Sequence, residues 1–314
     1  MRLSAAEHFS WADPLVSGSM RLSAAELKLD VSPRWYGAAG ASLVAAAVTA
    51  RYVRKWRQRR TLRQGQGDRA RGGGRYFIGL DLTDPTAKNK RPCDVAVLDG
   101  ELYCTFDQWN YKEDGSGIVP SRALGRSFIL AVDGPQGLAG DPDATMRESE
   151  RLVNAPGHTP YTLPTDGRPY AGFITGSVNL FHRLVTSGSR FRLLGMDGVP
   201  ASDANLLEVF PGGAWRKVAG TPLPPKRTLD GREARFELLH ALDMTFESEE
   251  LPTDDQLDAA MAAWVAYRFN EGAARAEGRA PEYDQEAGAI REGYVVQPIV
   301  GEETPEDAAA VAPV

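Results

Sequence analysis

The chain has 314 residues, of which 42% are apolar and 25% are charged, and its net charge is −6. A compact unit of this length buries about three-quarters of its unfolded surface, so neither disulfides nor a metal is needed to stabilise it. The two cysteines, Cys93 and Cys104, and the four histidines show no zinc-site spacing, which argues against a structural zinc module. The composition is that of an ordinary globular protein.

The charge divides the chain into two regions. Residues 1–75 carry 14 Lys and Arg against 5 Asp and Glu, a net charge of +9. Residues 76–314 carry 22 Lys and Arg against 37 Asp and Glu, a net charge of −15. This asymmetry predicts two regions with different partners.

Residues 1–34 are predicted to form a poorly ordered segment. The heptapeptide MRLSAAE occurs at residues 1–7 and again at residues 20–26. The repeat is typical of a local duplication or an added leader, so no argument about the fold rests on it.

Residues 35–53 are predicted to form a transmembrane helix. Residues 35–50 are uncharged, and with Tyr52 and Val53 they approach the roughly 20 residues that a membrane-spanning helix needs. An arginine-rich run follows, and positive charge beside a span stays on the cytoplasmic side. The pattern predicts a membrane-associated protein whose globular domain is cytoplasmic.

Other interpretations of this region stay open. Because the segment is mostly Ala and Gly, a helix that lies in the membrane surface or packs on a partner has the same pattern. A signal peptide cleaved after Ala50 is a weaker match, because signal peptides carry positive charge before the apolar core. The basic residues 54–75 are predicted to be a linker, with contact to anionic lipid or nucleic-acid phosphate as alternatives.

From residue 76 the pattern changes to short apolar runs closed by turn residues, which is typical of strands. Strands are predicted at 76–82, 93–100, 101–106, 127–135, 205–210 and 293–297, the first three forming a meander. Apolar spacing near 3.6 residues predicts helices at 144–153, 172–186, 232–242 and 254–269. Together they predict an α/β domain over 76–300, with a mixed sheet flanked by helices. The acidic residues 301–314 are predicted to be disordered.

Two of the predicted strands run directly into an acid, Asp81 in one and Asp133 in the other. If these strands are parallel neighbours, both carboxylates project at the carboxyl end of the sheet, where α/β proteins place their ligand sites. The alternative is that each Asp only accepts hydrogen bonds in the turn that follows it. The coincidence of two such strands favours the functional interpretation.

Glu208 is a third candidate because it interrupts the apolar run LLEVF. Burying an ionised glutamate is costly unless a cation or a hydrogen-bond donor meets it. On a half-exposed strand the same residue would simply face water.

The helix predicted at 254–269 supplies further acids. Residues 253–256 fit a capping box, so the positive end of the helix explains Asp254. Asp258 lies on the apolar stripe that should pack inward, and Asp255 lies one turn before it. Strand-end acids plus inward helix acids fit hard cations such as Mg²⁺ or Mn²⁺. Two such ions about 4 Å apart could support phosphodiester hydrolysis.

Several segments, taken in order, resemble a known family. They are RYFIGLDLT, FILAVDGPQGL, RESER, LLEVFPGGAWR, GREARFELL, DDQLDAAMAAWVAYRFNEG and GYVVQP. These segments resemble the predicted ribonuclease H-like nuclease family catalogued as domain of unknown function 429, over about residues 76–300. The most specific parts are Glu-x-x-Pro at 208–211 and Asp-x-x-Asp-Ala at 255–259.

The resemblance implies a ribonuclease H-like fold, whose acids sit on the first strand, a later strand and a closing helix. It implies Asp81, then Asp133 or Glu208, and then Asp255 or Asp258 as metal ligands. The predicted ligands are thus Asp81, Asp133, Glu208, Asp255 and Asp258, of which all but Asp255 are also predicted to be catalytic. The chain departs from the family pattern at Asp254, where a His is common.

An acidic domain needs positive side chains if it binds a phosphate-rich substrate. The candidates are Arg147, Arg151, Lys226 and Arg232, with Arg227 and Arg235 beside them. Solvated helix faces explain such residues equally well. Because the net charge is −15, a small or structured nucleic acid is expected rather than a broad duplex-binding surface.

The leading hypothesis is a metal-dependent nuclease tethered to the membrane. An actin-like phosphotransferase or ATPase is the second, although neither strand-end Asp is followed by a Gly-rich phosphate-binding loop. A non-catalytic membrane-linked binding module is the third. Titration with divalent metal separates the third hypothesis from the others, and nucleotide binding separates the second from the first.

Overall fold

The computed structural model describes residues 74–165, 167–188 and 190–300, which form an α/β domain. The predicted membrane helix at 35–53, nearly all of the linker that follows it and the tail at 301–314 lie outside these residues, so those assignments stay predictions. Among the described residues, no helix is both long and apolar enough to cross a bilayer.

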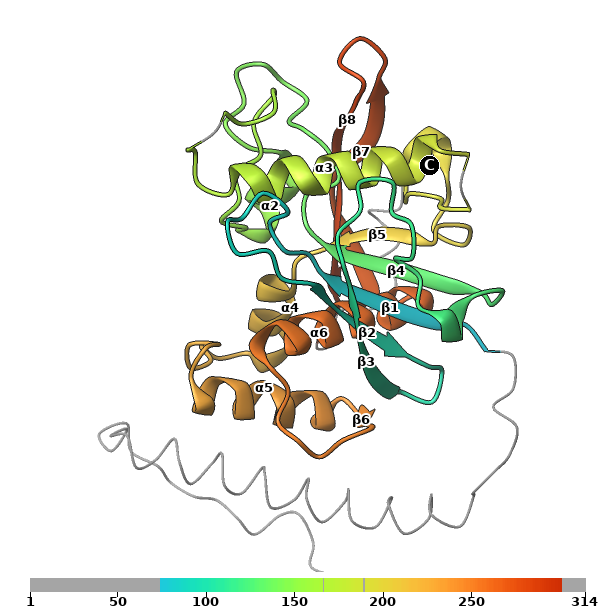
Figure 1. Cartoon of the computed structure of the whole chain (residues 1–314), viewed down its shortest axis with the longest axis vertical. Helices are drawn as coiled ribbons and strands as arrows, with labels where there is room; N and C mark the ends of the chain where they lie inside the picture. Colours follow the sequence, from blue (N-terminus) through green and yellow to red (C-terminus); the bar gives the residue numbers. More distant parts are fainter. Residues whose placement is uncertain (1–73, 166, 189, 301–314) are drawn as a thin grey trace, which may run out of the picture. The chain divides into compact units, whose positions relative to one another are not determined.

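Eight strands form one mixed sheet (Figure 1). They are β1 (Tyr76–Asp81), β2 (Cys93–Leu98), β3 (Tyr103–Trp109), β4 (Phe128–Asp133), β5 (Leu206–Val209), β6 (Thr245–Phe246), β7 (Ala274–Asp284) and β8 (Ala289–Pro298). Across the sheet their order is β6-β3-β2-β1-β4-β5-β8-β7. β1, β4, β5 and β8 pair in parallel, whereas β2 is antiparallel to β1 and β3, and β7 to β8. The predicted mixed sheet and its initial meander are confirmed.

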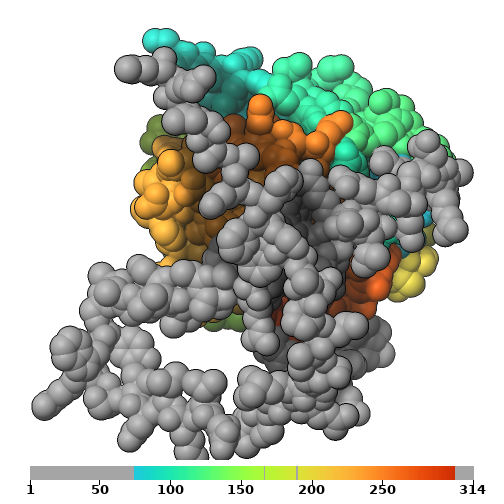
Figure 2. Space-filling view, turned by 90° about the horizontal axis from the view of Figure 1, so that it is seen from below, coloured from blue at the N-terminus to red at the C-terminus, as the bar shows by residue number. Residues whose placement is uncertain are grey.

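Helices cover both faces of the sheet, as predicted (Figure 1). They are α2 (Glu148–Val153), α3 (Ala171–Thr186), α4 (Pro211–Ala219), α5 (Leu229–Ala241) and α6 (Asp254–Asn270), with short 3-10 turns at Ser121–Ala123 and Met196–Gly198. α3 packs on one face, and α4, α5 and α6 contribute to the core of the other. Figure 2 shows the region of α5 in light orange on the surface of this second layer.

Burial on both faces explains the composition of the central strands. Residues 77–81 of β1 and 128–132 of β4 are all buried. Parallel strands covered on both sides are apolar throughout rather than alternating. In α6 every residue from 257 to 266 is buried, because the helix lies between the sheet and the outer helices α4 and α5.

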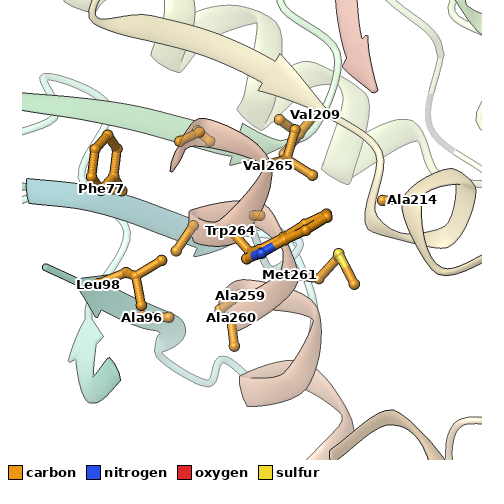
Figure 3. Close-up of a cluster of buried hydrophobic side chains, with 14 of the residues drawn as sticks. Phe77, Ala96, Leu98, Val209, Ala214, Ala259, Ala260, Met261, Trp264 and Val265 are labelled. Atoms are coloured by element: carbon orange, nitrogen blue, oxygen red, sulfur yellow. The ribbon is translucent and has the colours of Figure 1, made fainter. Parts of the chain in front are cut away.

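α6 and β1 approach each other very closely at Gly79. A Cβ atom on Gly79 would lie 2.0 Å from the carbonyl oxygen of Ala259 and 2.4 Å from the backbone nitrogen of Ala263. Glycine is therefore required here for space. Figure 3 shows the surrounding core, in which Phe77 of β1 lies on the sheet side and Trp264 belongs to the helix.

Three elements, α4, β6 and β7, were not predicted, and a fourth, β8, is longer than predicted. α4 begins directly at Pro211. Proline is favoured in the first turn of a helix, because a backbone N–H there would have no hydrogen-bond partner within the helix. β7 was not predicted, because it is charged along its length and contains Pro281. It is an edge strand with an irregular register between Arg279 and Glu282, and such strands tolerate proline. Pairing with β7 also makes β8 longer than the strand predicted at 293–297.

Gly79→Ala is expected to lower the free energy of unfolding by at least about 1–3 kcal/mol, because the new methyl group would force α6 away from β1. Gly100→Ala is the matched control, since a Cβ atom there meets nothing within 4 Å. Urea unfolding of both variants measures the difference. Equal stability of the two variants would contradict the close approach.

Candidate functional site

A row of carboxylates crosses the sheet at the carboxyl ends of β1 and β4. Asp81 is in register with Asp133 of the parallel strand β4 and with Asp94 of the antiparallel strand β2. Side chains alternate between the two faces of a strand, so all three lie on the face where Phe77 and Ala96 pack against the α6 layer. The structure thus brings Asp81 and Asp133 together and adds Asp94 to them.

The start of α6 brings two further carboxylates to this row. The predicted capping box is present. Thr253 Oγ1 accepts a hydrogen bond from the backbone N–H of Gln256, and Gln256 Oε1 accepts one from the backbone N–H of Thr253. This cap starts the helix at Asp254. Asp255 and Asp258 then lie on its buried side, 9% and 5% exposed.

Three side chains hold the acids of α6. Lys226 Nζ lies 2.6 Å from Asp258 Oδ2 and 3.9 Å from Asp255 Oδ1. Trp215 Nε1 donates a hydrogen bond of 2.7 Å to Asp258 Oδ1. The guanidinium group of Arg91 contacts Asp255, although the Arg91 side chain is 61% exposed.

Asp81 and Asp133 are placed differently from the acids of α6. Within residues 74–300, leaving aside 166 and 189, no cation or hydrogen-bond donor directly contacts either carboxylate. Asp81 is nevertheless only 7% exposed, and Asp133 is partly exposed. A carboxylate that is largely removed from water without a partner is energetically unfavourable, which marks these two residues as the strained part of the cluster.

The pKa values reflect this excess of negative charge. Burial raises the pKa of Asp81 well above its usual range, and the charge of Asp133 raises it further. Burial also raises the pKa of Asp133, an effect that Asp258 reinforces and Lys226 opposes. Burial lowers the pKa of Lys226, but the carboxylates of Asp258, Asp81 and Asp255 outweigh it, so that the net shift is upward. One lysine therefore does not neutralise the cluster.

This set of donors fits a hard divalent cation in its chemistry. Carboxylate oxygens are the ligands that such cations prefer, and Asp81 and Asp133 leave negative charge for an added cation to neutralise. In the part of the chain that the structure describes, no three acidic, His or Cys side chains form a ready-made metal-binding group. The ammonium group of Lys226 lies against Asp258 and near Asp255, so ion binding there requires these side chains to rearrange.

Glu208, predicted to bind metal and act in catalysis with the aspartates, does not lie on their face of the sheet. Leu207 and Val209 face the α6 side of the sheet, so Glu208 between them faces the opposite side. There Arg147 Nη1 donates to Glu208 Oε2 at 2.7 Å, and the Gln136 amide donates to the same oxygen at 2.8 Å. These donors offset part of the burial cost of the glutamate, although burial still raises the pKa of Glu208 above its usual value.

Arg147, predicted to bind substrate, lies in the interior of the domain. Its side chain is fully buried, and it pairs with Glu150 at 3.3 Å as well as with Glu208. Removing one partner of such a buried pair typically costs about 3–5 kcal/mol, because the other charge stays buried and uncompensated. The pair therefore belongs to the framework of the domain.

The other predicted cationic residues are dispersed. Arg151 is exposed on α2, 3.9 Å from Glu148. Arg232 on α5 is half-buried and donates to the Pro252 carbonyl at 3.5 Å. Of the four predicted substrate-binding residues, Lys226 is the one that lies among the acids.

Sequence reasoning missed Asp94, Arg91 and Trp215. Asp94 lies in an apolar strand, and its value as a candidate depends on its register with Asp81, which the sequence does not reveal. Trp215 lies on α4, a helix that the sequence did not predict. Arg91 lies between β1 and β2 and carries no distinguishing pattern.

Asp133→Asn is expected to stabilise the metal-free domain at neutral pH. The pKa of Asp133 is higher in the folded domain than in the unfolded chain. Ionisation of Asp133 therefore lowers the free energy of unfolding once the pH exceeds the pKa of the unfolded state. The melting temperature in EDTA should therefore rise at about pH 7 and change little at about pH 3.5. Asp254→Asn, at the helix end, is the control that should show no such gain. A loss of stability at neutral pH in Asp133→Asn would contradict the electrostatic argument.

A family model described as Protein of unknown function (DUF429) matches residues 121–283. No curated protein and no solved structure matches the chain. The match includes Asp133, Asp255 and Asp258 but begins after β1, and therefore after Asp81. Since it covers more than half of the 314 residues, the chain belongs to the DUF429 family of proteins of unknown function.

Proposed function

We propose that this protein is a divalent-metal-dependent nuclease with a ribonuclease H-like domain. The observation that carries the proposal is the register of Asp81 with Asp133 at the ends of two parallel strands, next to the acids of α6. Acids on the first strand, a later strand and the closing helix are the arrangement that the family resemblance implies. Membrane tethering through residues 35–53 is the part of the proposal that rests on sequence alone.

Asp81, Asp133 and Asp258 would hold Mg²⁺ or Mn²⁺, with Asp255 beside them. A bound ion of this kind lowers the pKa of a water molecule and stabilises the leaving oxygen of a phosphodiester. No histidine or serine nucleophile is needed for such a reaction, which agrees with the scarcity of histidine in the chain.

The remaining residues of the cluster position these ligands. Trp215 fixes the orientation of Asp258 through its hydrogen bond to Oδ1. Lys226 neutralises part of the negative charge when no cation is bound. Arg91 is mostly exposed at the rim, where its planar guanidinium group can pair with a substrate phosphate. The excess of acid over the domain favours a small or structured nucleic acid over a long duplex.

The turn after Asp133 favours this function over an actin-like phosphotransferase. Phosphotransferases of that kind cradle phosphate with free backbone amides in the turns after the strand-end acids. Here the amide of Gln136, three residues after Asp133, donates to Glu208 instead. This backbone amide is therefore already hydrogen-bonded within the domain and is not free to bind a phosphate.

Asp81→Asn is expected to leave the domain folded but to abolish cleavage of RNA and DNA oligonucleotides, because Asn keeps the shape of Asp and removes the charge that holds the cation. Its melting temperature should also stop responding to Mn²⁺. Asp254→Asn is the matched control and should keep both properties. If the wild-type chain cleaves neither substrate with Mg²⁺ or Mn²⁺ and shows no metal-dependent rise in melting temperature, the non-catalytic alternative takes precedence.

Lys226→Gln is expected to destabilise the metal-free domain, because Asp258 loses the cation that pairs with it and Asp255 keeps only Arg91. Mn²⁺ should then raise the melting temperature of this variant by more than that of wild type, since the ion takes over the neutralisation. Arg227→Gln is the control, because Arg227 is the adjacent cation and its side chain is 88% exposed. An equal or smaller response to Mn²⁺ in Lys226→Gln would show that the ion binds elsewhere.

A further inference from the structure

A second concentration of charge lies at the opposite end of the central strands. A pocket of about 390 Å³ opens beside the amino ends of β1, β4 and β5. Four arginines line it, and Asp203 is the one acid in its lining. The arginines are Arg75, Arg126, Arg190 and Arg192.

The strands separate this pocket from the acid cluster. Arg75 directly precedes β1, whose other end is Asp81, and Ser127 directly precedes β4, whose other end is Asp133. At roughly 3.3 Å per residue, a six-residue strand separates its two ends by roughly 17–20 Å. The pocket is therefore a separate site, and its role does not depend on the proposed nuclease activity.

The pocket carries more positive charge than its partners balance. Arg192 is paired with Asp203, with Nη2 and Oδ2 3.3 Å apart. In the described ranges, neither Arg126 nor Arg190 has an acidic partner.

Arg75 is also without a counter-ion in the described part of the chain. Its Nε donates to Ser127 Oγ at 2.9 Å and its Nη1 to Asn270 Oδ1 at 2.8 Å, and both of these oxygens are neutral. Among the described residues, three guanidinium groups of the pocket therefore lack an acidic partner, and two of them, Arg126 and Arg190, belong to residues 76–314, whose net charge is −15. A positive pocket on an otherwise acidic domain attracts an anion to that pocket, because the rest of the surface repels it.

The backbone at Arg190 and Arg192, and the guanidinium group of Arg190, are held in place before any ligand arrives. Asn205 Oδ1 accepts a hydrogen bond of 2.7 Å from the Arg192 amide, and Asn205 Nδ2 donates one of 2.9 Å to the Arg190 carbonyl. The Arg190 guanidinium group lies over the Phe128 ring, 4.7 Å from its centre. Groups ordered in advance lose less entropy on binding, so the pocket is preorganised.

We infer that this pocket binds a phosphate or polyphosphate group. Planar guanidinium groups match phosphate oxygens in pairs, and the pocket volume falls in the range of small-ligand sites. Three uncompensated positive charges match a diphosphate or triphosphate better than a single carboxylate. A free polyphosphate, including a nucleoside triphosphate, and the phosphorylated end of a nucleic-acid strand share this chemistry.

Calorimetric titration of the full chain with tripolyphosphate in EDTA tests the inference, because EDTA prevents phosphate from binding through a metal at the acid cluster. Wild type should bind in a saturable, salt-sensitive manner. Arg126→Ala combined with Arg190→Ala should weaken binding about a hundredfold, at about tenfold for each charge-assisted contact. Arg168→Ala combined with Arg183→Ala removes the same charge from exposed positions outside the pocket and should leave binding unchanged.

Asp203→Asn provides a change in the opposite direction. It removes the acid that pairs with Arg192, so binding should become several-fold tighter. A 5′-phosphorylated oligonucleotide and its dephosphorylated form then distinguish the two sources: preference for the phosphorylated form assigns a strand end, and equal weak binding of both assigns a free polyphosphate. No saturable binding by wild type, or equal losses in the two double variants, would overturn the inference.

Discussion

The contact between Gly79 and the backbone of α6 is the constraint on which the candidate site depends. Because β1 lacks a side chain at this point, the helix lies directly on the strand, with Ala259 and Ala263 at the contact. The same contact sets how far along β1 the first turns of α6 lie. It therefore brings Asp258 to the end of the strand where Asp81 projects, and a wider separation would leave these carboxylates too far apart to act on one ligand.

The domain pairs one group of interior charges with donors and leaves another without partners among the described residues. Glu208 and Arg147 are paired and hydrogen-bonded, so this polar network strengthens the framework. Asp81 and Asp133 have raised pKa values and lie next to further acids, an arrangement that opposes folding at neutral pH. Strain of this kind is typically concentrated at functional sites, where a ligand relieves it. The contrast between the two groups is the physical reason to place function at the aspartates.

Features coded by local sequence were predictable, and features set by long-range register were not. The apolar runs that end in Asp81 and Asp133, and the capping box before Asp254, define their elements within a few residues. Side chains of β5 alternate between the two faces of the sheet, so the face on which Glu208 lies depends on the register of this strand. A shift of one residue would place Glu208 on the opposite face. Asp94 becomes a candidate only through its pairing with Asp81, and the arginine pocket only through the meeting of four separate segments.

A crystal structure of the full chain soaked with Mn²⁺, with anomalous scattering measured at the manganese edge, tests the central claim most directly. We expect a manganese peak bound by Asp81, Asp133 and at least one acid of α6, with the Lys226 ammonium group moved away from Asp258. Manganese absent from these carboxylates at saturating concentration, or bound only elsewhere on the domain, would contradict the account.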